Sequence, residues 1–304
     1  MRIDCTRKPL FGVAGFPPAF FESIYRKKRE NIFAWLGSLG LDWIELQNTY
    51  GVKMKDEQAY IYKELAQRYH IGLSLHAPYY ITLASADPGV VERSKERILQ
   101  CCRLALKIGA TRIIFHPGHF PGKTLEARAE AVAKIVDGLN SIESEIPEGV
   151  YIYPETSGKR TQIGSVKEIT TICRKVKYAR PCIDVAHVHG FEGGTITSEE
   201  RICDIFNTIE GDLGRSYLEN THFHMYPVEI DHNGEKRHKA FEDRIEYQQI
   251  ELFQDEAYNN RYYPLPEHFV SAIKHKGLFP VVVCEARDSQ ERGALLMKRI
   301  YDNA

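Results

Sequence analysis

The chain has 304 residues, of which 43% are hydrophobic and 27% are charged. This composition excludes a disordered chain, a collagen and a coiled coil, and the length is enough to bury one large core. The chain has 40 basic and 41 acidic residues, so its formal net charge of −1 indicates no general attraction to nucleic acids or membranes. Any binding of a polyanion would therefore depend on a local patch.

The cysteine content and the N-terminal segment bear on the cellular compartment. Seven cysteines without a C-x-x-C pair argue against a disulfide framework and against a thiolate zinc site. The segment MRIDCTRKPL has no apolar core that could act as a signal sequence. No run approaches the roughly 18 apolar residues needed to span a bilayer. We therefore expect a cytoplasmic protein without a membrane partner.

Short runs of β-branched and aromatic residues alternate with longer stretches of helical period along the whole chain. The expected strands are, in chain order, residues 9–14, 41–46, 71–76, 111–116, 150–155, 180–185, 221–226 and 279–285. Their continuous apolar runs are typical of strands buried on both faces of a parallel sheet.

The helices between these strands have recognisable ends. Four pairs have the spacing of an N-terminal cap and its helix-starting partner: Asp87 with Pro88, Ser165 with Glu168, Thr197 with Glu200, and Asp288 with Glu291. Three glycines stand just before a strand, where a left-handed residue ends a helix: Gly40, Gly109 and Gly277.

Eight strand–helix pairs without a linker predict a single (βα)8 TIM barrel over residues 1–304. A doubly wound sheet is the structural alternative. The segment 227–264, between the seventh strand and the seventh helix, is far longer than the usual connection of roughly 2 to 6 residues. We expect this insert to hold a helix over 242–258 and to act as a lid or a partner-binding segment at the catalytic end.

Residue types that bind metals recur at or near the carboxyl ends of six consecutive expected strands. They are His76, His116, Glu155, Asp184, His222 and Glu285, with His187 three residues after Asp184 and His238 on the insert. A parallel barrel brings these strand ends to one mouth. Burying such charges is costly unless they are compensated, and divalent ions supply that compensation.

The mixture of imidazoles and carboxylates suits Zn²⁺, Mn²⁺ or Fe²⁺ better than Ca²⁺ or Mg²⁺. A zinc ion takes about three protein ligands and keeps an open position, so this set predicts two or three ions, with Glu155 as a bridge. The alternative for any one histidine is a hydrogen-bonded structural role. The occurrence of His, Asp or Glu at or near the same end of six consecutive strands favours the metal interpretation.

Basic and aromatic residues on mouth-side loops are candidates for substrate binding. Lys159, Arg160, Lys236 and Arg237 could contact phosphates, although such residues commonly only solvate a loop. Tyr79 and Tyr80 follow the His76 strand directly, where an aromatic ring could stack on a substrate or simply pack on the rim.

Six motifs carry a family resemblance, and they occur in the family's order. They are LSLHAPYYITLAS (73–85), IIFHPG (113–118), PETSGKRTQIG (154–164), CIDVAH (182–187), THFH (221–224) and VVVCEA (281–286). On these motifs the chain resembles the endonuclease IV family of apurinic/apyrimidinic endonucleases, within the xylose isomerase-like TIM barrel superfamily. The resemblance implies a DNA-repair enzyme with a trinuclear zinc centre that cleaves damaged DNA 5′ to an abasic sugar. We also expect the chain to be a monomer.

The resemblance also implies roles for individual residues. Its first metal would be held by His76, His116 and Glu155, its second by Glu155, Asp184, His222 and Glu285, and its third by His187 and His238. A hydroxide that bridges the metals would attack phosphorus, and Tyr79 would fall where the family places a minor-groove tyrosine. We take Glu155 and Glu285 as the candidate catalytic residues, and Tyr79 with the loop residues Lys159 and Arg237 as the candidate substrate-binding residues. The family's third metal also takes an aspartate two residues before the last histidine, where this chain has Lys236, preceded by Glu235.

Two other functions remain open from the sequence. A sugar isomerase or epimerase of the same superfamily would need only Glu155, Asp184, His222 and Glu285 around one Mn²⁺ or Mg²⁺ ion. A barrel without catalytic activity could instead serve as a binding module through its insert. The number of bound ions distinguishes these possibilities.

Overall fold

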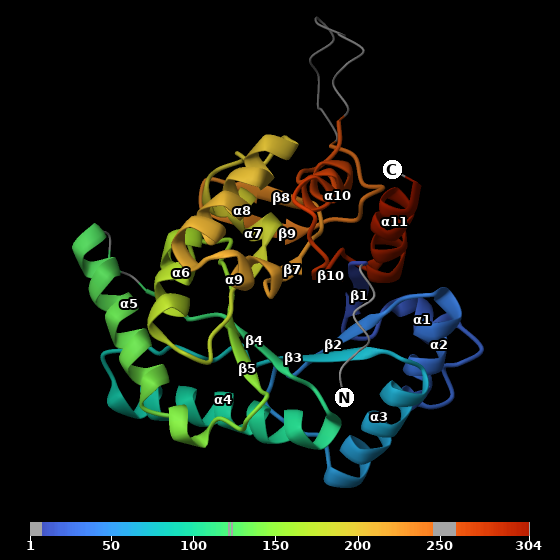
Figure 1. The fold of residues 1–304 in the computed structure, drawn as a ribbon, viewed down its shortest axis with the longest axis horizontal. Coiled ribbons are helices and arrows are strands. Elements are labelled where there is room, and N and C mark those ends of the chain that lie inside the picture. The colour runs from blue at the N-terminus through green and yellow to red at the C-terminus, as the bar shows by residue number, and fades with distance from the viewer. Residues whose placement is uncertain (1–7, 121, 123, 246–259, 304) are drawn as a thin grey trace, which may run out of the picture.

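The computed structural model describes residues 8–120, 122, 124–245 and 260–303 (Figure 1). The eight predicted strands are all present. They are β1 (Leu10–Ala14), β2 (Trp43–Gln47), β3 (Gly72–His76), β4 (Arg112–Phe115), β5 (Tyr151–Pro154), β6 (Cys182–Asp184), β7 (His222–His224) and β10 (Val281–Cys284).

These strands form one parallel sheet in the order β5-β4-β3-β2-β1-β10-β7-β6. Its two outer strands are linked by parallel bridges from Ile152 to Ala179 and from Glu155 to Cys182. The backbone N–H of Thr156 also donates to the carbonyl oxygen of Cys182 at 3.1 Å. The sheet is therefore a nearly closed barrel, which confirms the predicted TIM barrel rather than a doubly wound sheet.

Helices lie outside the strands (Figure 1). They are α1 (Pro18–Glu22), α2 (Ile32–Leu39), α3 (Asp56–Arg68), α4 (Pro88–Ile108), α5 (Leu125–Asn140), α6 (Val166–Lys175), α7 (Val185–Phe191), α8 (Glu199–Leu213), α9 (Arg215–Glu219), α10 (Pro266–His275) and α11 (Gln290–Asn303). Short 3₁₀ turns occur at η1 (Arg29–Asn31) and η2 (Glu143–Glu145). Within the described part of the chain, no helix is both long and apolar enough to cross a membrane.

Two of the predicted helix starts are confirmed and two are wrong. Asp87 caps α4 with Pro88 as the first helical residue, and Ser165 and Glu168 form a reciprocal capping box on α6. The other two helices begin later than predicted. Helix α8 is capped by Ser198, whose hydroxyl accepts from the N–H of Arg201, rather than by Thr197. Helix α11 begins at Gln290, after Asp288 in a left-handed conformation with φ of 53°.

The predicted helix-ending glycines are confirmed, since Gly40, Gly109 and Gly277 have φ angles of 73°, 77° and 59°. Each ends a helix shortly before β2, β4 or β10 begins. A residue with a Cβ would be strained in this conformation, and glycine avoids that strain.

The insert after β7 contains an antiparallel hairpin, β8 (Val228–Asp231) and β9 (Gly234–His238). The backbone N–H of Glu235 donates to the carbonyl oxygen of Gly158 at 2.9 Å, which ties the hairpin to the loop after β5. Residues 242–245 form a turn and a short bridge, so no helix begins at Glu242. The rest of the predicted helix, residues 246–258, lies outside the described residues.

Gly12 allows two barrel strands to approach closely, and we expect Gly12→Ala to destabilise the protein. A Cβ on Gly12 in β1 would overlap the backbone carbonyl and the Cβ of Trp43 in β2. Because the obstructing atoms belong to a neighbouring strand, the free energy of unfolding should fall by about 1 to 3 kcal/mol. Urea denaturation measures this loss.

Gly138 provides a matched control, because it lies inside α5 and its added Cβ would meet only Leu83 Cδ2 at an ordinary 3.7 Å. Gly138→Ala should leave stability unchanged or raise it by up to about 1 kcal/mol, since alanine favours a helix over glycine. Equal unfolding free energies for Gly12→Ala and the unchanged protein would contradict the packing argument.

Candidate metal centre

Glu155 lies at the centre of a group of ionisable side chains at the carboxyl ends of the barrel strands. It follows β5 directly and is fully buried. Its Oε2 atom lies 3.2 Å from Nε2 of His76 and 3.4 Å from Nε2 of His116. His76 is the last residue of β3 and His116 follows β4, so three neighbouring strands bring these side chains together.

The other oxygen of Glu155 faces the opposite side of the barrel. Its Oε1 atom lies 2.9 Å from Nδ1 of His224 and 3.5 Å from Nδ1 of His187. The same nitrogen of His224 is 3.9 Å from Oδ2 of Asp184 and 3.7 Å from Oε1 of Glu285. We call Glu155 and the residues around it, His76, His116, Asp184, His224 and Glu285, the mouth group.

Asp184 has two separate roles within this arrangement. Its Oδ1 atom accepts a 2.8 Å hydrogen bond from the backbone N–H of His187 and so caps α7. Its Oδ2 atom is buried and has no hydrogen-bond partner among the described residues. A carboxylate oxygen buried without a donor is costly, and it is the kind of atom that a cation would satisfy.

His222 does not lie beside Asp184 and Glu285, where the resemblance would put it, and His224 takes that position instead. In the sheet, His224 is in register with Asp184 of β6 and Val283 of β10, whereas His222 is in register with Cys182 and Val281. Because the barrel interior is filled in layers, His222 lies one layer deeper than the mouth.

A second group of possible ligands, which we call the hairpin group, consists of His187, Glu235 and His238. Glu235 Oε2 lies 2.9 Å from Nε2 of His187, and its Oε1 lies 3.1 Å from Nε2 of His238. The ring of His238 stacks on Tyr226 with the ring centroids 4.1 Å apart, and its Nδ1 is 2.9 Å from the carbonyl oxygen of Glu285. The hairpin therefore reaches the mouth group.

A β-bulge explains why Glu235 rather than Lys236 belongs to this group. The pairing of β8 with β9 shifts after Glu229, which lies opposite Arg237, while Ile230 lies opposite Glu235. The extra residue on β9 changes the alternation of side chains between the two faces of the hairpin. Lys236 is consequently exposed and ion-paired with Glu229 on the outer side.

Burial and neighbouring charges shift the pKa values within the mouth group in opposite directions. Burial would raise the pKa of Glu155, but the charges and hydrogen bonds of the surrounding histidines hold it well below its usual range. Burial raises the pKa of Asp184 to about 6, and it lowers that of His116 to about 4. For His76 the hydrogen bond and charge of Glu155 outweigh burial and raise the pKa to about 9.

The predicted substrate-binding residues lie outside these groups. Tyr79 is 64% exposed on the loop after β3, and Lys159 is exposed on the loop after β5. Arg237 is exposed on β9, and its Nε lies 2.9 Å from Oε2 of Glu229. All three side chains are therefore accessible to a large ligand. Within the described part of the chain, none of them is hydrogen-bonded or ion-paired to the mouth group.

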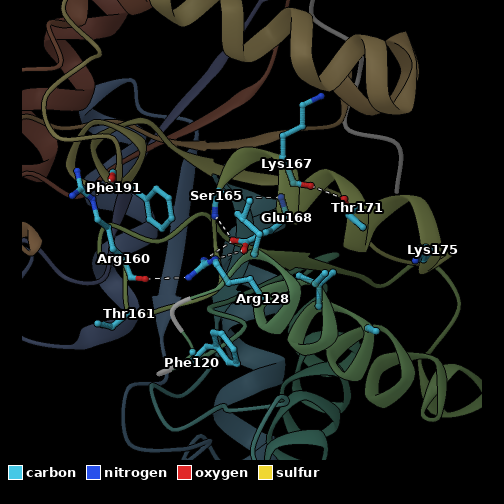
Figure 2. Close-up of a pocket in the computed structure, with 15 residues that line it drawn as sticks. Phe120, Arg128, Arg160, Thr161, Ser165, Lys167, Glu168, Thr171, Lys175 and Phe191 are labelled. Atoms are coloured by element: carbon cyan, nitrogen blue, oxygen red, sulfur yellow. Dashed lines mark hydrogen bonds and ion pairs between the residues drawn. The ribbon is translucent and has the colours of Figure 1, made fainter.

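A cavity of about 810 Å³ lies between α5, α6 and the loop after β5, separate from both groups (Figure 2). Its Arg128 donates to Glu168 Oε1 at 2.7 Å and to the carbonyl oxygen of Gln162 at 2.8 Å. Arg128 therefore joins α5 to the start of α6. Arg160 lines the same cavity and donates to the carbonyl oxygen of Phe191 at 3.0 Å.

The sequence did not predict His224 or Glu45, a buried residue of β2 whose carboxylate lies 3.0 Å from Nε2 of His222 and 3.2 Å from Nε2 of His224, and it left Glu235 open. Glu45 was overlooked, although a lone charge inside the apolar segment LDWIEL is a visible signal. His224 lies two residues from His222 on the same strand, so both side chains point into the barrel. Glu235 could not be preferred over Lys236 without knowing that the hairpin has a bulge.

The family model for the xylose isomerase-like TIM barrel matches residues 33–294 of the chain. An uncharacterized protein of Methanocaldococcus jannaschii is 27% identical over 294 residues, which cover 95% of this chain and 96% of that protein. The probable endonuclease 4 of Ureaplasma parvum is 28% identical over 185 residues, 58% of this chain and 59% of that protein.

Solved structures with different activities have the same fold as this chain. Endonuclease IV from Thermus thermophilus matches with a TM-score of 0.61 at 12% identity, over 98% of this chain and all of that one. A 3-keto-D-glucoside 4-epimerase from E. coli matches with a TM-score of 0.64 at 11% identity, over 98% of this chain and all of that one. At such identities the likeness shows the fold alone.

Proposed function

This chain belongs to the xylose isomerase-like TIM barrel family, and from that premise we propose that it is a metal-dependent phosphodiesterase that cleaves DNA at abasic sites. The observation that carries the proposal is the hairpin group of His187, Glu235 and His238, which adjoins the mouth group. A family member that holds a single ion has no need of this second set of donors.

The residues present fit divalent metal ions. His76, His116 and Glu155 offer donor atoms that all lie within 4.8 Å of one another, and so do the three residues of the hairpin group. The buried, unpartnered Oδ2 of Asp184 adds a further donor. The donors of these groups are imidazole nitrogens and carboxylate oxygens, which suit Zn²⁺.

In this proposal His76 and His116 hold one ion together with Glu155, while Asp184, His224 and Glu285 hold a second. The hairpin group holds a third. Bound divalent ions lower the pKa of water and stabilise charge on a phosphoryl group. The strand ends hold the donor atoms in fixed positions. Glu155 and Glu285 would face the reacting phosphate.

Residues outside the two groups would position the DNA. Tyr79 offers an exposed ring that can stack beside the lesion, and Lys159 and Arg237 offer cations for phosphates. The overall charge of −1 gives no general attraction to DNA, so these local contacts must supply it.

The proposal is tested with an oligonucleotide duplex that contains one tetrahydrofuran site. Protein loaded with Zn²⁺ should cut the strand 5′ to the site and leave an undamaged duplex intact, and chelation should abolish the cut. A fully metallated protein that leaves the tetrahydrofuran strand whole would rule out this function.

Metal binding should release protons, because several of the proposed ligands are protonated in the metal-free protein. The carboxylates around them outweigh burial and raise the pKa values of His76 and His238 to about 9, and that of His187 well above its usual range. A ligand nitrogen must lose its proton to bind. The apparent affinity should therefore rise between pH 6 and pH 8 by about tenfold per pH unit for each proton released.

Calorimetric titration of the metal-free protein with Zn²⁺, in buffers of different ionisation enthalpy, measures this release. We expect at least about two protons per chain at pH 7. An affinity that does not change with pH would contradict the proposed histidine ligands.

A sugar isomerase or epimerase is the second candidate, and one observation favours it. Nδ1 of His224 lies within 3.9 Å of carboxylate oxygens of Glu155, Asp184 and Glu285, so these four side chains alone surround one point. One ion there, beside a bound sugar, would leave the glutamates to move protons. Elemental analysis that finds one ion per chain, together with epimerisation of a ketose, would favour this function over cleavage of DNA.

A further inference from the structure

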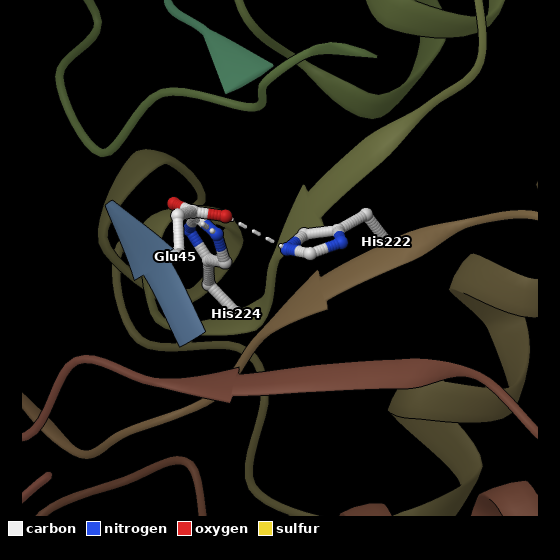
Figure 3. A group of neighbouring side chains, drawn as sticks. All are labelled: Glu45, His222 and His224. Carbon is white, nitrogen blue, oxygen red and sulfur yellow. Dashed lines mark ion pairs between the residues drawn. The ribbon is translucent and has the colours of Figure 1, made fainter. Parts of the chain in front are cut away.

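Three side chains converge inside the barrel directly below the mouth group, with which they share His224 (Figure 3). Glu45 comes from β2, and His222 and His224 come from β7. All three side chains are fully buried. Oε2 of Glu45 lies 3.0 Å from Nε2 of His222, and its Oε1 lies 3.2 Å from Nε2 of His224. We call these three residues the inner group.

The contacts in the inner group have hydrogen-bond distances but lack hydrogen-bond alignment. Glu45 Oε1, His222 Nε2 and His224 Nε2 have no hydrogen-bond partner within the described residues. Burying three adjacent polar atoms without hydrogen bonds would cost free energy of folding. A carboxylate and two imidazole nitrogens that lie within 4.8 Å of one another without such hydrogen bonds have the spacing of metal ligands.

The protein fixes the carboxylate of Glu45 in its place. The hydroxyl of Ser74 donates to Glu45 Oε2 at 2.9 Å, and the indole N–H of Trp43 donates to the oxygen of Ser74 at 2.9 Å. Such partners behind a ligand orient it toward the metal. Glu45 is thus held with both oxygens directed at the two histidines.

No lysine or arginine among the described residues is ion-paired with Glu45. Arg112 contacts His222 rather than Glu45: one guanidinium nitrogen lies 3.5 Å from Nδ1 of His222, and the guanidinium stacks on Trp43 and Tyr153. The negative charge of a carboxylate that is buried without a direct cationic partner must be compensated by another group. In this layer only the two imidazoles or a bound cation can supply it.

We propose that the inner group is a separate Zn²⁺ site, bound by both oxygens of Glu45 and by Nε2 of His222 and His224. Two imidazoles and a carboxylate are ligand types that zinc prefers, and a carboxylate that binds through both oxygens gives the ion four donor atoms. The site shares His224 with the mouth group but uses the other ring nitrogen, and it does not depend on the function proposed for the mouth and hairpin groups.

His224 links the inner group to the mouth group, because its Nδ1 faces Glu155 while its Nε2 faces Glu45. An ion on each side of the ring would require both nitrogens to be free of protons, and two adjacent cations favour that state. The inner ion would then orient His224 toward the mouth. Loss of the inner ion should therefore weaken metal binding at the mouth by about 10- to 100-fold, as loss of a ligand's outer partner does.

Anomalous diffraction at the zinc edge, from crystals of the full chain grown with Zn²⁺, tests the site directly. We expect a peak enclosed by Glu45, His222 and His224, distinct from any peak beside Glu155. No peak in the inner group would overturn the proposal, whether or not the mouth is filled, and would leave Glu45 as a hydrogen-bond partner of the histidines. An empty mouth beside a filled inner group would count against the proposed phosphodiesterase instead.

Variants provide a second measurement in solution. Glu45→Gln and His222→Asn should each lower the zinc content by one ion per chain while ions at the mouth remain at saturating Zn²⁺. Glu145→Gln is the matched control, because it removes the same charge from an exposed position in η2, and it should keep the full zinc content. Unchanged zinc content in folded Glu45→Gln and His222→Asn proteins would overturn the inner site, and the diffraction experiment decides the matter if these variants do not fold.

Discussion

Glu155→Gln should lower the rate of cleavage at an abasic site by at least about 1,000-fold. Both oxygens of Glu155 lie close to histidine nitrogens, 3.2 Å from His76 on one side and 2.9 Å from His224 on the other. An amide has one oxygen instead of two and carries no charge. The variant therefore removes the bridge between two proposed ions and the charge that compensates them, and elemental analysis should find fewer ions per chain.

Glu145→Gln is the matched control, since Glu145 is exposed in η2 and the substitution removes the same charge away from the barrel mouth. Its metal content and cleavage rate should equal those of the unchanged protein. Circular dichroism shows whether each variant keeps its secondary structure. A folded Glu155→Gln protein with full metal content and full activity would exclude Glu155 as a ligand.

Glu235→Gln should remove one ion per chain and lower the cleavage rate by about 100-fold or more. Glu235 contacts both histidines of the hairpin group, and no other carboxylate lies within 4.0 Å of Nε2 of His238 among the described residues. Zinc content, measured with the cleavage rate on the tetrahydrofuran duplex, tests this prediction.

Lys236→Asp sharpens the test, because it restores the aspartate that the endonuclease IV resemblance implies at this position. Lys236 is exposed and ion-paired with Glu229, so an aspartate there would point away from His187 and His238. Lys236→Asp should therefore fail to rescue Glu235→Gln in the double variant. Recovery of the lost ion in that variant would show that the bulge does not determine the ligand.

The residues that form the barrel could be predicted from the sequence because a buried strand or helix face requires a recognisable pattern of apolar residues within its own segment. A strand covered on both faces needs an uninterrupted apolar run, and such runs occur eight times, with stretches of helical period between them. The ligand types at their ends, such as Glu155 and His76, were visible for the same reason. A charge at the end of an apolar run marks where the strand meets the mouth.

Which of two neighbouring residues enters a site depends on contacts between segments far apart in the chain. His224 rather than His222 reaches Glu155 because β7 pairs with β6 in a register that sets His224 beside Asp184. Register is fixed by the packing of whole strands, and the sequence of β7 alone has histidine at both positions.

The sequence by itself determined the order of strands and helices, the barrel, and the types of metal-binding side chain at its mouth. These features depend on the spacing of apolar residues and on residue type, which are both local properties of the chain. Only the tertiary structure decided that Glu235 replaces Lys236 and that Glu45 joins His222 and His224. These choices follow from a bulge between two strands and from the layering of side chains across the barrel, and both arise when distant segments pair.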